Sequence, residues 1–289
     1  MRALSQECEG ARRFRLGAID VAVSSDLREV LDCFSSLYAQ FRHEGPPSDR
    51  TVRMEVRKSS RWRRRYDIYG DGQTVRRNRR VKELLPFLEW AINARVIATR
   101  SDYLQLHAAT LALDGQGVIL TGSPGAGKST LAAGLAARGW RYLCDEFALI
   151  DPLTLRAAPF PKALCIKAGS FDVVRSVNLK LAGDGYHVKG FKGPVGYVSA
   201  PGISNSKSVE SVPVRTIVFL NYAGGVEPQA YSVPRYRAVL GLAGQTLNRN
   251  VFGVRTASIL SQLVKGAACW GLDSGEIGAT CRRVEALLR

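Results

Sequence analysis

A glycine-rich stretch near the middle of the 289-residue chain constrains the fold most. Residues Gly122 to Ser129 satisfy the pattern G-x-x-x-x-G-K-[ST], in which backbone N–H groups surround the phosphates of a nucleotide. Glycine permits this turn because no Cβ blocks the backbone conformation or the approach of the phosphates. The predicted nucleotide-binding residues are Gly122, Ser123, Pro124, Gly125, Ala126, Gly127, Lys128, Ser129 and Thr130.

The segments on either side of this phosphate loop support the interpretation. Residues 117–121 read as a buried strand, and residues 131–137 read as a helix of small residues packed on a sheet. A helix that begins near the end of the loop adds its positive N-terminus to the site. We expect Lys128 to reach the β- and γ-phosphates of the nucleotide and the Ser129 hydroxyl to bind Mg²⁺. The sequence therefore predicts an α/β nucleotide-binding core.

The region before this core, residues 1–100, reads as a small α+β domain with an antiparallel sheet, and residues 101–289 read as the nucleotide-binding domain. Alternating apolar and polar residues predict a strand over 14–23 and strands around 52–56 and 62–69, followed by a tight turn at residues 70–72. Apolar residues at helical spacing predict a helix over 27–41 and a connecting helix over 84–98.

Positive charge is concentrated in the same region. The net charge is +16, and the stretch from Arg50 to Lys82 holds thirteen Lys or Arg against three acids. Such a stretch could hold an acidic protein or peptide, could bind nucleic acid, or could be a solvated face. Aromatic residues interleave with the charges, but no RNA-binding signature is present. Nucleic acid is therefore the least favoured of the three.

The composition is that of a soluble globular chain, with 46% apolar and 23% charged residues. No apolar run is long enough for a membrane helix, and the N-terminus lacks the order of a signal peptide. The six cysteines form no metal-ligand pattern and are expected to be reduced. We therefore expect a cytoplasmic protein without a membrane partner.

Two further features lie close to the loop in sequence. Residues 104–113 read as a strand, and Asp114–Gly117 as the turn of a hairpin that enters the loop strand. After the loop helix, a short strand ends at the acidic pair Asp145-Glu146. One helix and one strand fill the gap from Lys128, so the carboxylates are expected beside the bound magnesium and γ-phosphate.

Together, His107, the hairpin, the phosphate loop and Cys144-Asp145-Glu146 resemble HPr kinase/phosphorylase and, more closely, the bacterial HPr-kinase-related kinases. The resemblance implies a core like that of phosphoenolpyruvate carboxykinase, ATP-dependent phosphorylation of a serine hydroxyl on a protein or peptide, and a homo-oligomer. It also implies that Asp145 is the general base, that Glu146 helps Ser129 to hold Mg²⁺, and that His107 lies near the active site.

The chain departs from the bifunctional enzymes of that family at two places. Thr130 stands where they carry an acid, and Cys165–Ala168 lacks the acid of their Glu-Ile-Arg-Gly type signature. We therefore expect kinase activity without phosphorylase activity, and a substrate other than HPr.

Later segments supply further candidates. Residues 183–202 read as an irregular basic loop that could cover the phosphates. Arg215, just before an apolar strand, could stabilise the transferred phosphoryl group, as could Arg235 or Arg237. Helices are predicted over 237–248, 255–267 and 276–288.

The leading prediction is an ATP- and Mg²⁺-dependent serine kinase whose basic domain recruits the substrate. A nucleotide-dependent switch ATPase and a small-molecule hydroxyl kinase are the alternatives. A transport ATPase is disfavoured because the sequence has no Leu-Ser-Gly-Gly-Gln, and a GTPase because it has no Asn-Lys-x-Asp.

Overall fold

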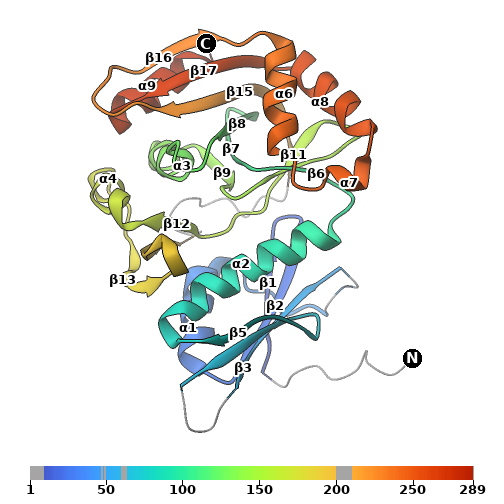
Figure 1. Ribbon diagram of the computed structural model, residues 1–289, viewed down its shortest axis with the longest axis vertical. Helices are drawn as coiled ribbons and strands as arrows, with labels where there is room; N and C mark the ends of the chain where they lie inside the picture. Colours follow the sequence, from blue (N-terminus) through green and yellow to red (C-terminus); the bar gives the residue numbers. More distant parts are fainter. Residues whose placement is uncertain (1–9, 47, 49, 60–63, 200–209, 289) are drawn as a thin grey trace.

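The computed structural model describes residues 10–46, 48, 50–59, 64–199 and 210–288. These residues form a mixed α/β fold with a five-stranded, a nine-stranded and a three-stranded sheet (Figure 1). Trp62 and Cys8 lie outside the described residues. In the described part of the chain, each helix is too short or too polar to span a lipid bilayer.

The N-terminal sheet has the strand order β1-β2-β3-β4-β5. Its strands are β1 (Arg12–Leu16), β2 (Ile19–Ser25), β3 (Val52–Lys58), β4 (Tyr66–Gly70) and β5 (Gln73–Arg79). Two helices, α1 (Arg28–Leu37) and α2 (Val81–Thr99), pack on its apolar face, and a short 3₁₀ turn, η1 (Ala39–Phe41), follows α1. The tight turn predicted between β4 and β5 is confirmed, since Asp71 and Gly72 both have positive φ.

Two details of the predicted small domain are wrong. The sheet is not wholly antiparallel, because β2 and β3 run parallel, with α1 as the crossover between them. The strand predicted over residues 14–23 is instead the hairpin of β1 and β2. Gly17 makes its turn with φ +61°, and a Cβ there would lie 2.2 Å from the carbonyl oxygen of Pro159.

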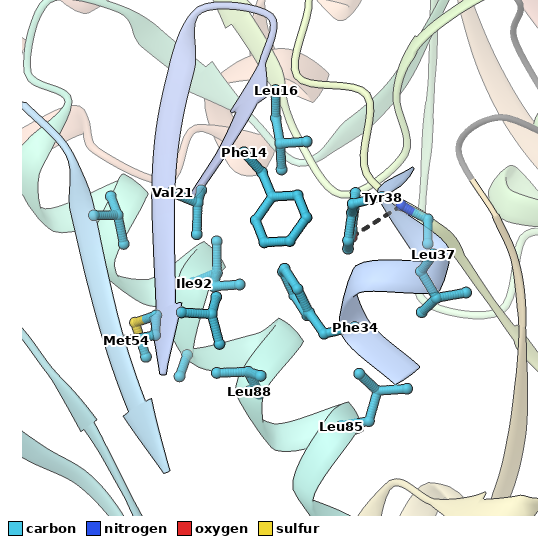
Figure 2. Close-up of a cluster of buried hydrophobic side chains, with 14 of the residues drawn as sticks. Phe14, Leu16, Val21, Phe34, Leu37, Tyr38, Met54, Leu85, Leu88 and Ile92 are labelled. Atoms are coloured by element: carbon cyan, nitrogen blue, oxygen red, sulfur yellow. Dashed lines mark hydrogen bonds between the residues drawn. The ribbon is translucent and has the colours of Figure 1, made fainter. Parts of the chain in front are cut away.

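The core of this unit is aromatic at its centre. Figure 2 shows Phe14 of β1 packed against both Phe34 and Tyr38, with Leu88 and Ile92 of α2 in the same cluster. The Phe14 and Phe34 rings meet edge to face, with centroids 5.2 Å apart. The same cluster continues into the second half of the chain through Phe147, Phe160 and Tyr197. One hydrophobic core therefore spans the predicted boundary near residue 100.

A buried polar network fixes the same junction. The Lys162 ammonium lies 2.7 Å from the Glu89 carboxylate and donates to the Asn93 side chain, also at 2.7 Å. Tyr38 donates its hydroxyl to Glu89 and accepts the backbone N–H of Ala163. Because the Lys162 and Glu89 charges are paired and hydrogen-bonded, the core can bury both side chains. The network anchors the segment that leads into β12 (Leu164–Lys167) to α2.

The nine-stranded sheet has the path β6-β10-β11-β15-β8-β7-β9, with β17 added beside β15 and β16 beside β17. Its strands are β6 (Leu104–Leu106), β7 (Ala108–Leu113), β8 (Gln116–Gly122), β9 (Arg141–Cys144), β10 (Ala148–Ile150), β11 (Arg156–Ala158), β15 (Val212–Tyr222), β16 (Gln229–Ser232) and β17 (Ala268–Ser274). The strand predicted over 104–113 is interrupted at His107, because β6 pairs with β10 whereas β7 pairs with β8 and β9.

Helices cover both faces of this sheet (Figure 1). On one face lie α3 (Lys128–Ala137) and α9 (Ile277–Ala286), which share a core with β8. On the other lie α6 (Arg235–Gln245), α7 (Arg249–Phe252) and α8 (Arg255–Lys265). The three helices predicted near the C-terminus are therefore confirmed as α6, α8 and α9.

The third sheet corrects the expectation of an irregular basic loop. Strands β13 (Ala182–Val188) and β14 (Pro194–Val198) form a hairpin beside β12, joined by the 3₁₀ turn η3 (Gly190–Lys192). A second 3₁₀ turn, η2 (Ala168–Ser170), and the short helix α4 (Phe171–Ser176) follow β12. The hairpin gives residues 189–192 a defined position, while residues 200–202 of the predicted loop lie outside the described residues.

Candidate functional site

The strand directions bring the sequence motifs to one edge of the nine-stranded sheet. β7 is antiparallel to both β8 and β9, so the start of β7 and the ends of β8 and β9 lie at the same edge. In this register, Ala108 faces Thr121 and Thr110 faces Cys144. His107, the phosphate loop and Asp145 therefore converge, although the acidic pair is separated from β8 by β7 rather than lying on the adjacent strand.

The phosphate loop needs glycine at its two ends. Gly122 has φ +153°, and a Cβ there would lie 2.5 Å from the carbonyl oxygen of Leu220. Gly127 is left-handed, with φ +87°, and directly precedes the first residue of α3. The first turn of α3, whose N–H groups are not capped by the side chain of its N-cap residue, therefore begins at the end of the loop, and such a helix N-terminus favours a phosphate.

Lys128 is held inside this loop. Its side chain is only 8% exposed, and its ammonium donates to the carbonyl oxygens of Gly122 at 2.8 Å and Ser123 at 3.1 Å. Burial lowers the pKa of Lys128, against the opposing attraction of Asp145 and Glu146. The ammonium is already turned toward the loop, so a phosphate could replace the two carbonyl groups.

Asp145 is the most perturbed acid of the site. It is 7% exposed, and among the described residues its Oδ1 atom has no hydrogen-bond partner. Burial, reinforced by the neighbouring Glu146 carboxylate, raises the pKa of Asp145 to about 7, although Ser129 and Lys128 act in the opposite direction. A carboxyl group with this pKa exchanges a proton readily near neutral pH.

Glu146 lies between His107 and Lys189. The ring Nδ1 of His107 is 3.1 Å from the backbone oxygen of Glu146, and the Lys189 ammonium is 3.7 Å from its carboxylate. Burial acts to raise the pKa of Glu146, but Lys189 and then Lys162 hold that pKa below its usual value. The pKa of His107 is lowered by burial and by Lys128, so the ring is neutral at pH 7.

These groups line a cavity of about 240 Å³. Lys167, Ser170, Lys189 and Lys192 also line it, so the third sheet closes the side opposite the loop. A larger cavity of about 960 Å³ is also lined by Gly125, Gly127, Thr130 and Ser170. Its other walls include Tyr222, Val226, Pro228 and Ile277, which suit the less polar part of a nucleotide.

The structure does not bring all predicted residues together. Arg215 lies near the start of β15, where its neighbours Val214 and Thr216 face Gly117 and Val118 of β8. The loop begins at the other end of β8, beside Leu220, so Arg215 lies at the opposite edge of the sheet. Arg235 and Arg237 begin α6, and neither is among the described residues that line the two cavities.

Positive charge near the acidic pair comes instead from Lys167, Lys189 and Lys192. Lys167 lies in Cys165–Ala168, the segment compared with the Glu-Ile-Arg-Gly type signature, but the sequence assigns neither it nor Ser170 to the site, and it places the other two lysines only in a basic loop. The one sequence signal for them is the basic, glycine-rich composition of residues 183–193. Thr130, which stands where the bifunctional enzymes carry an acid, donates its hydroxyl to Ser170 at 3.2 Å.

A magnesium ion fits the donor set only together with a nucleotide. No three His, Cys, Asp or Glu side chains of the described residues converge as in an all-protein metal site. Mg²⁺ commonly uses one or two carboxylates plus phosphate oxygens. The partnerless Oδ1 of Asp145, the adjacent Ser129 and the Glu146 carboxylate provide such a partial set.

Comparisons with known proteins give two similarities. A family model described as SynChlorMet cassette protein ScmC matches residues 80–183, which include α2, the phosphate loop and the acidic pair. The Hpr(Ser) kinase/phosphatase from Coxiella burnetii is a similar solved structure, with 14% sequence identity and a TM-score of 0.34. That match covers 64% of this chain and 91% of the other. No curated protein matches the sequence significantly.

Proposed function

We propose that this protein is an ATP-dependent kinase that transfers the γ-phosphoryl group to a serine hydroxyl of a protein or peptide, without phosphorylase activity. One observation carries the proposal: the buried carboxyl group of Asp145, with a pKa of about 7, lies at the same sheet edge as a phosphate loop and lines the same cavity. A purely structural acid at this position would be expected to have a hydrogen-bond partner on both oxygens.

In the proposed reaction, the loop amides and Lys128 hold the nucleotide phosphates, and the less polar cavity takes the nucleoside. Ser129 and Glu146 would hold Mg²⁺, which neutralises charge on the β- and γ-phosphates. Asp145 accepts the proton of the serine hydroxyl while the serine oxygen attacks the γ-phosphorus and the bond to the leaving ADP oxygen breaks. The neutral ring of His107 holds the Glu146 backbone, and so the acidic pair, in position.

The lysines of the third sheet take the role that the sequence suggests for an arginine. Lys189 and Lys192 line the cavity, and Lys189 already pairs with Glu146. If Glu146 held Mg²⁺, the Lys189 ammonium would be free to offset charge on the transferred phosphoryl group. Charge of this kind, fixed before the reaction, is usually a large contribution to phosphoryl transfer.

The experiment is a transfer assay with γ-labelled ATP, Mg²⁺ and serine peptides encoded beside the gene. We expect label on a serine, and we expect the Asp145→Asn variant to lose about 10²- to 10⁴-fold in rate, the usual contribution of a general base. The matched control is Asp172→Asn, because Asp172 is an exposed acid on α4.

Three other results would reject the proposal. Label that appears only as inorganic phosphate indicates a nucleotide-hydrolysing switch protein. Label on a metabolite, found by incubating a metabolite extract, indicates a small-molecule kinase. Full transfer by the Asp145→Asn variant removes the assigned base.

A further inference from the structure

A band of positive charge lies along one edge of the N-terminal sheet. β5 is the last strand of that sheet and, among the described residues, pairs only with β4. Arg77, Arg80 and Lys82 are exposed, and the neighbouring Arg76 and Arg79 are half-buried. The nearby acid Glu83 is already engaged by Arg79 and by the backbone N–H of Arg80. We call residues 76–82 the basic edge.

Phe87 of α2 and the η3 turn lie between the basic edge and the cavity that contains Asp145. The Arg79 guanidinium lies 5.2 Å from the centroid of the Phe87 ring on α2. That ring lies beside Gly190, where an added Cβ would be 3.7 Å from it. Gly190 stands between Lys189 and Lys192, which line the cavity that contains Asp145. Cations therefore lie at both ends of a path from β5 past Phe87 of α2 to the acidic pair, as the positions of β5, α2 and β13 in Figure 1 allow.

An exposed aromatic ring lies on this route. Phe191, in the η3 turn between the two lysines, is 98% exposed. Burying a phenylalanine side chain is favourable, so this exposed ring, next in sequence to Lys192 of the cavity, offers a bound ligand an apolar contact. Along this route a ligand would meet the exposed cations of the basic edge, then the apolar ring of Phe191, and then the proposed base Asp145.

We propose that the basic edge is the docking site for an acidic, extended segment of the peptide substrate, with Phe191 contacting an apolar side chain between that segment and the acceptor serine. The proposal rests on the kinase function proposed above, because it takes the serine to be the phosphoryl acceptor, but the docking itself does not require catalysis. An edge strand presents backbone N–H and C=O groups to an extended peptide, and complementary charge orients the encounter.

The aromatic residues beside the basic edge argue for a peptide over a single-stranded nucleic acid. Nucleic acid of that kind binds by stacking its bases on open aromatic faces. Here the Arg76 guanidinium lies over the Trp90 ring, 3.8 Å from its centroid, and Arg79 lies near the Phe87 ring. The cations already lie over these two rings, so the basic edge itself offers charge rather than a run of open aromatic faces, and Phe191 is a single open ring farther along the route.

The test measures binding without ATP, by fluorescence anisotropy at low salt. The probe is a labelled synthetic peptide with six glutamates, one leucine and one serine, in that order, and its partner probe has glutamine in place of glutamate. The variant combines Arg77→Glu, Arg80→Glu and Lys82→Glu, all at exposed sites. The charge-matched control combines Arg249→Glu, Arg255→Glu and Lys265→Glu on α7 and α8, also at exposed sites.

We expect the basic-edge variant to weaken binding of the acidic peptide about tenfold or more, since each of three surface charges contributes modestly. The control should bind within about twofold of the unchanged protein, and the glutamine peptide should bind weakly to all three. Phe191→Ala should weaken binding of the acidic peptide by a smaller factor, and Phe191→Tyr should retain it. Equal losses in both triple variants, or tighter binding of a single-stranded oligonucleotide that depends on the same residues, would overturn the proposal.

The same proteins separate docking from catalysis. If the acidic peptide docks at the basic edge but no label moves from ATP, the kinase function is rejected and the docking site stands. If label moves to the peptide with the same KM in the basic-edge variant, the docking site is rejected and the kinase function stands.

Discussion

The edge of the large sheet that carries the phosphate loop, called here the loop edge, and the basic edge of the small sheet both carry positive charge, but in different physical states. At the loop edge, Lys128 is nearly buried, donates to two carbonyl groups and faces two carboxylates. At the basic edge, Arg77 and Arg80 stand in solvent. A charge in a buried, polar-lined cavity interacts strongly with its neighbours, whereas solvent screens an exposed one.

This difference separates two kinds of function. Buried charges that converge on a small cavity have shifted pKa values and fixed positions, which are the requirements of chemistry. Exposed charges that follow a strand keep their ordinary hydration and can only attract and orient a partner. Substitutions at the first edge should therefore abolish a reaction, and substitutions at the second should change recognition.

The largest effect is expected from Lys128→Met. In the proposed reaction the ammonium compensates phosphate charge at the loop, so its loss should reduce phosphoryl transfer, or any ATP turnover, by about 10³-fold or more. Lys265→Met, at an exposed lysine on α8, is the matched control and should keep the full rate. Turnover in Lys128→Met within a factor of three of the control would show that the loop does not bind phosphate as proposed.

An effect on stability is expected at Asp145. Its pKa of about 7 in the folded protein exceeds the ordinary value of 3.8, so the folded state binds the proton more tightly than the unfolded state. The free energy of unfolding should then fall as pH rises from about 4 to about 7, and remain low above that. The Asp145→Asn variant has no such proton, so it should match the unchanged protein near pH 4 and exceed its stability at pH 8 by about 4 kcal/mol.

Urea unfolding at the two pH values measures this difference. An Asp145→Asn variant that is less stable than the unchanged protein at pH 8 would mean that favourable interactions hold the carboxylate, and that its burial does not destabilise the folded state.

The smallest effect is expected from the triple substitution at the basic edge. Its three side chains are exposed, so charge reversal should change the free energy of unfolding by less than about 1 kcal/mol. Thermal unfolding compared with the α7–α8 control checks this value. A loss of several kcal/mol would show that the edge is part of the fold, and would remove the contrast between the two edges.

Local features of the site were predictable from sequence because they depend on short-range chemistry. The loop pattern, the hairpin turn at Asp114 and the helix after Lys128 are fixed by glycines and by apolar spacing within a few residues. The acidic pair was predictable because only one helix and one strand separate it from the loop. The roles of His107, Asp145 and Glu146 stay predictions, although the structure brings all three to one edge.

Features that depend on pairing between distant strands were not predictable. Arg215 stands before an apolar strand, but only the parallel pairing of β15 with β8 determines that it lies at the edge away from the loop. Lys189 and Lys192 reach the cavity because β13 and β14 pair beside β12, and nothing near them in sequence requires that pairing. The turn at Gly17 likewise depends on the close approach of Pro159.

The pH dependence of the transfer rate tests the central claim, that Asp145 is the base at the phosphate loop, most directly. With the peptide that accepts label from ATP, kcat/KM should rise from pH 5.5 and level off above an apparent pKa of about 7, because the carboxyl group must lose its proton to act. In Asp145→Asn that rise should disappear together with most of the rate. A rate that is constant from pH 5.5 to 8.5, or the same rise in the variant, would contradict the claim.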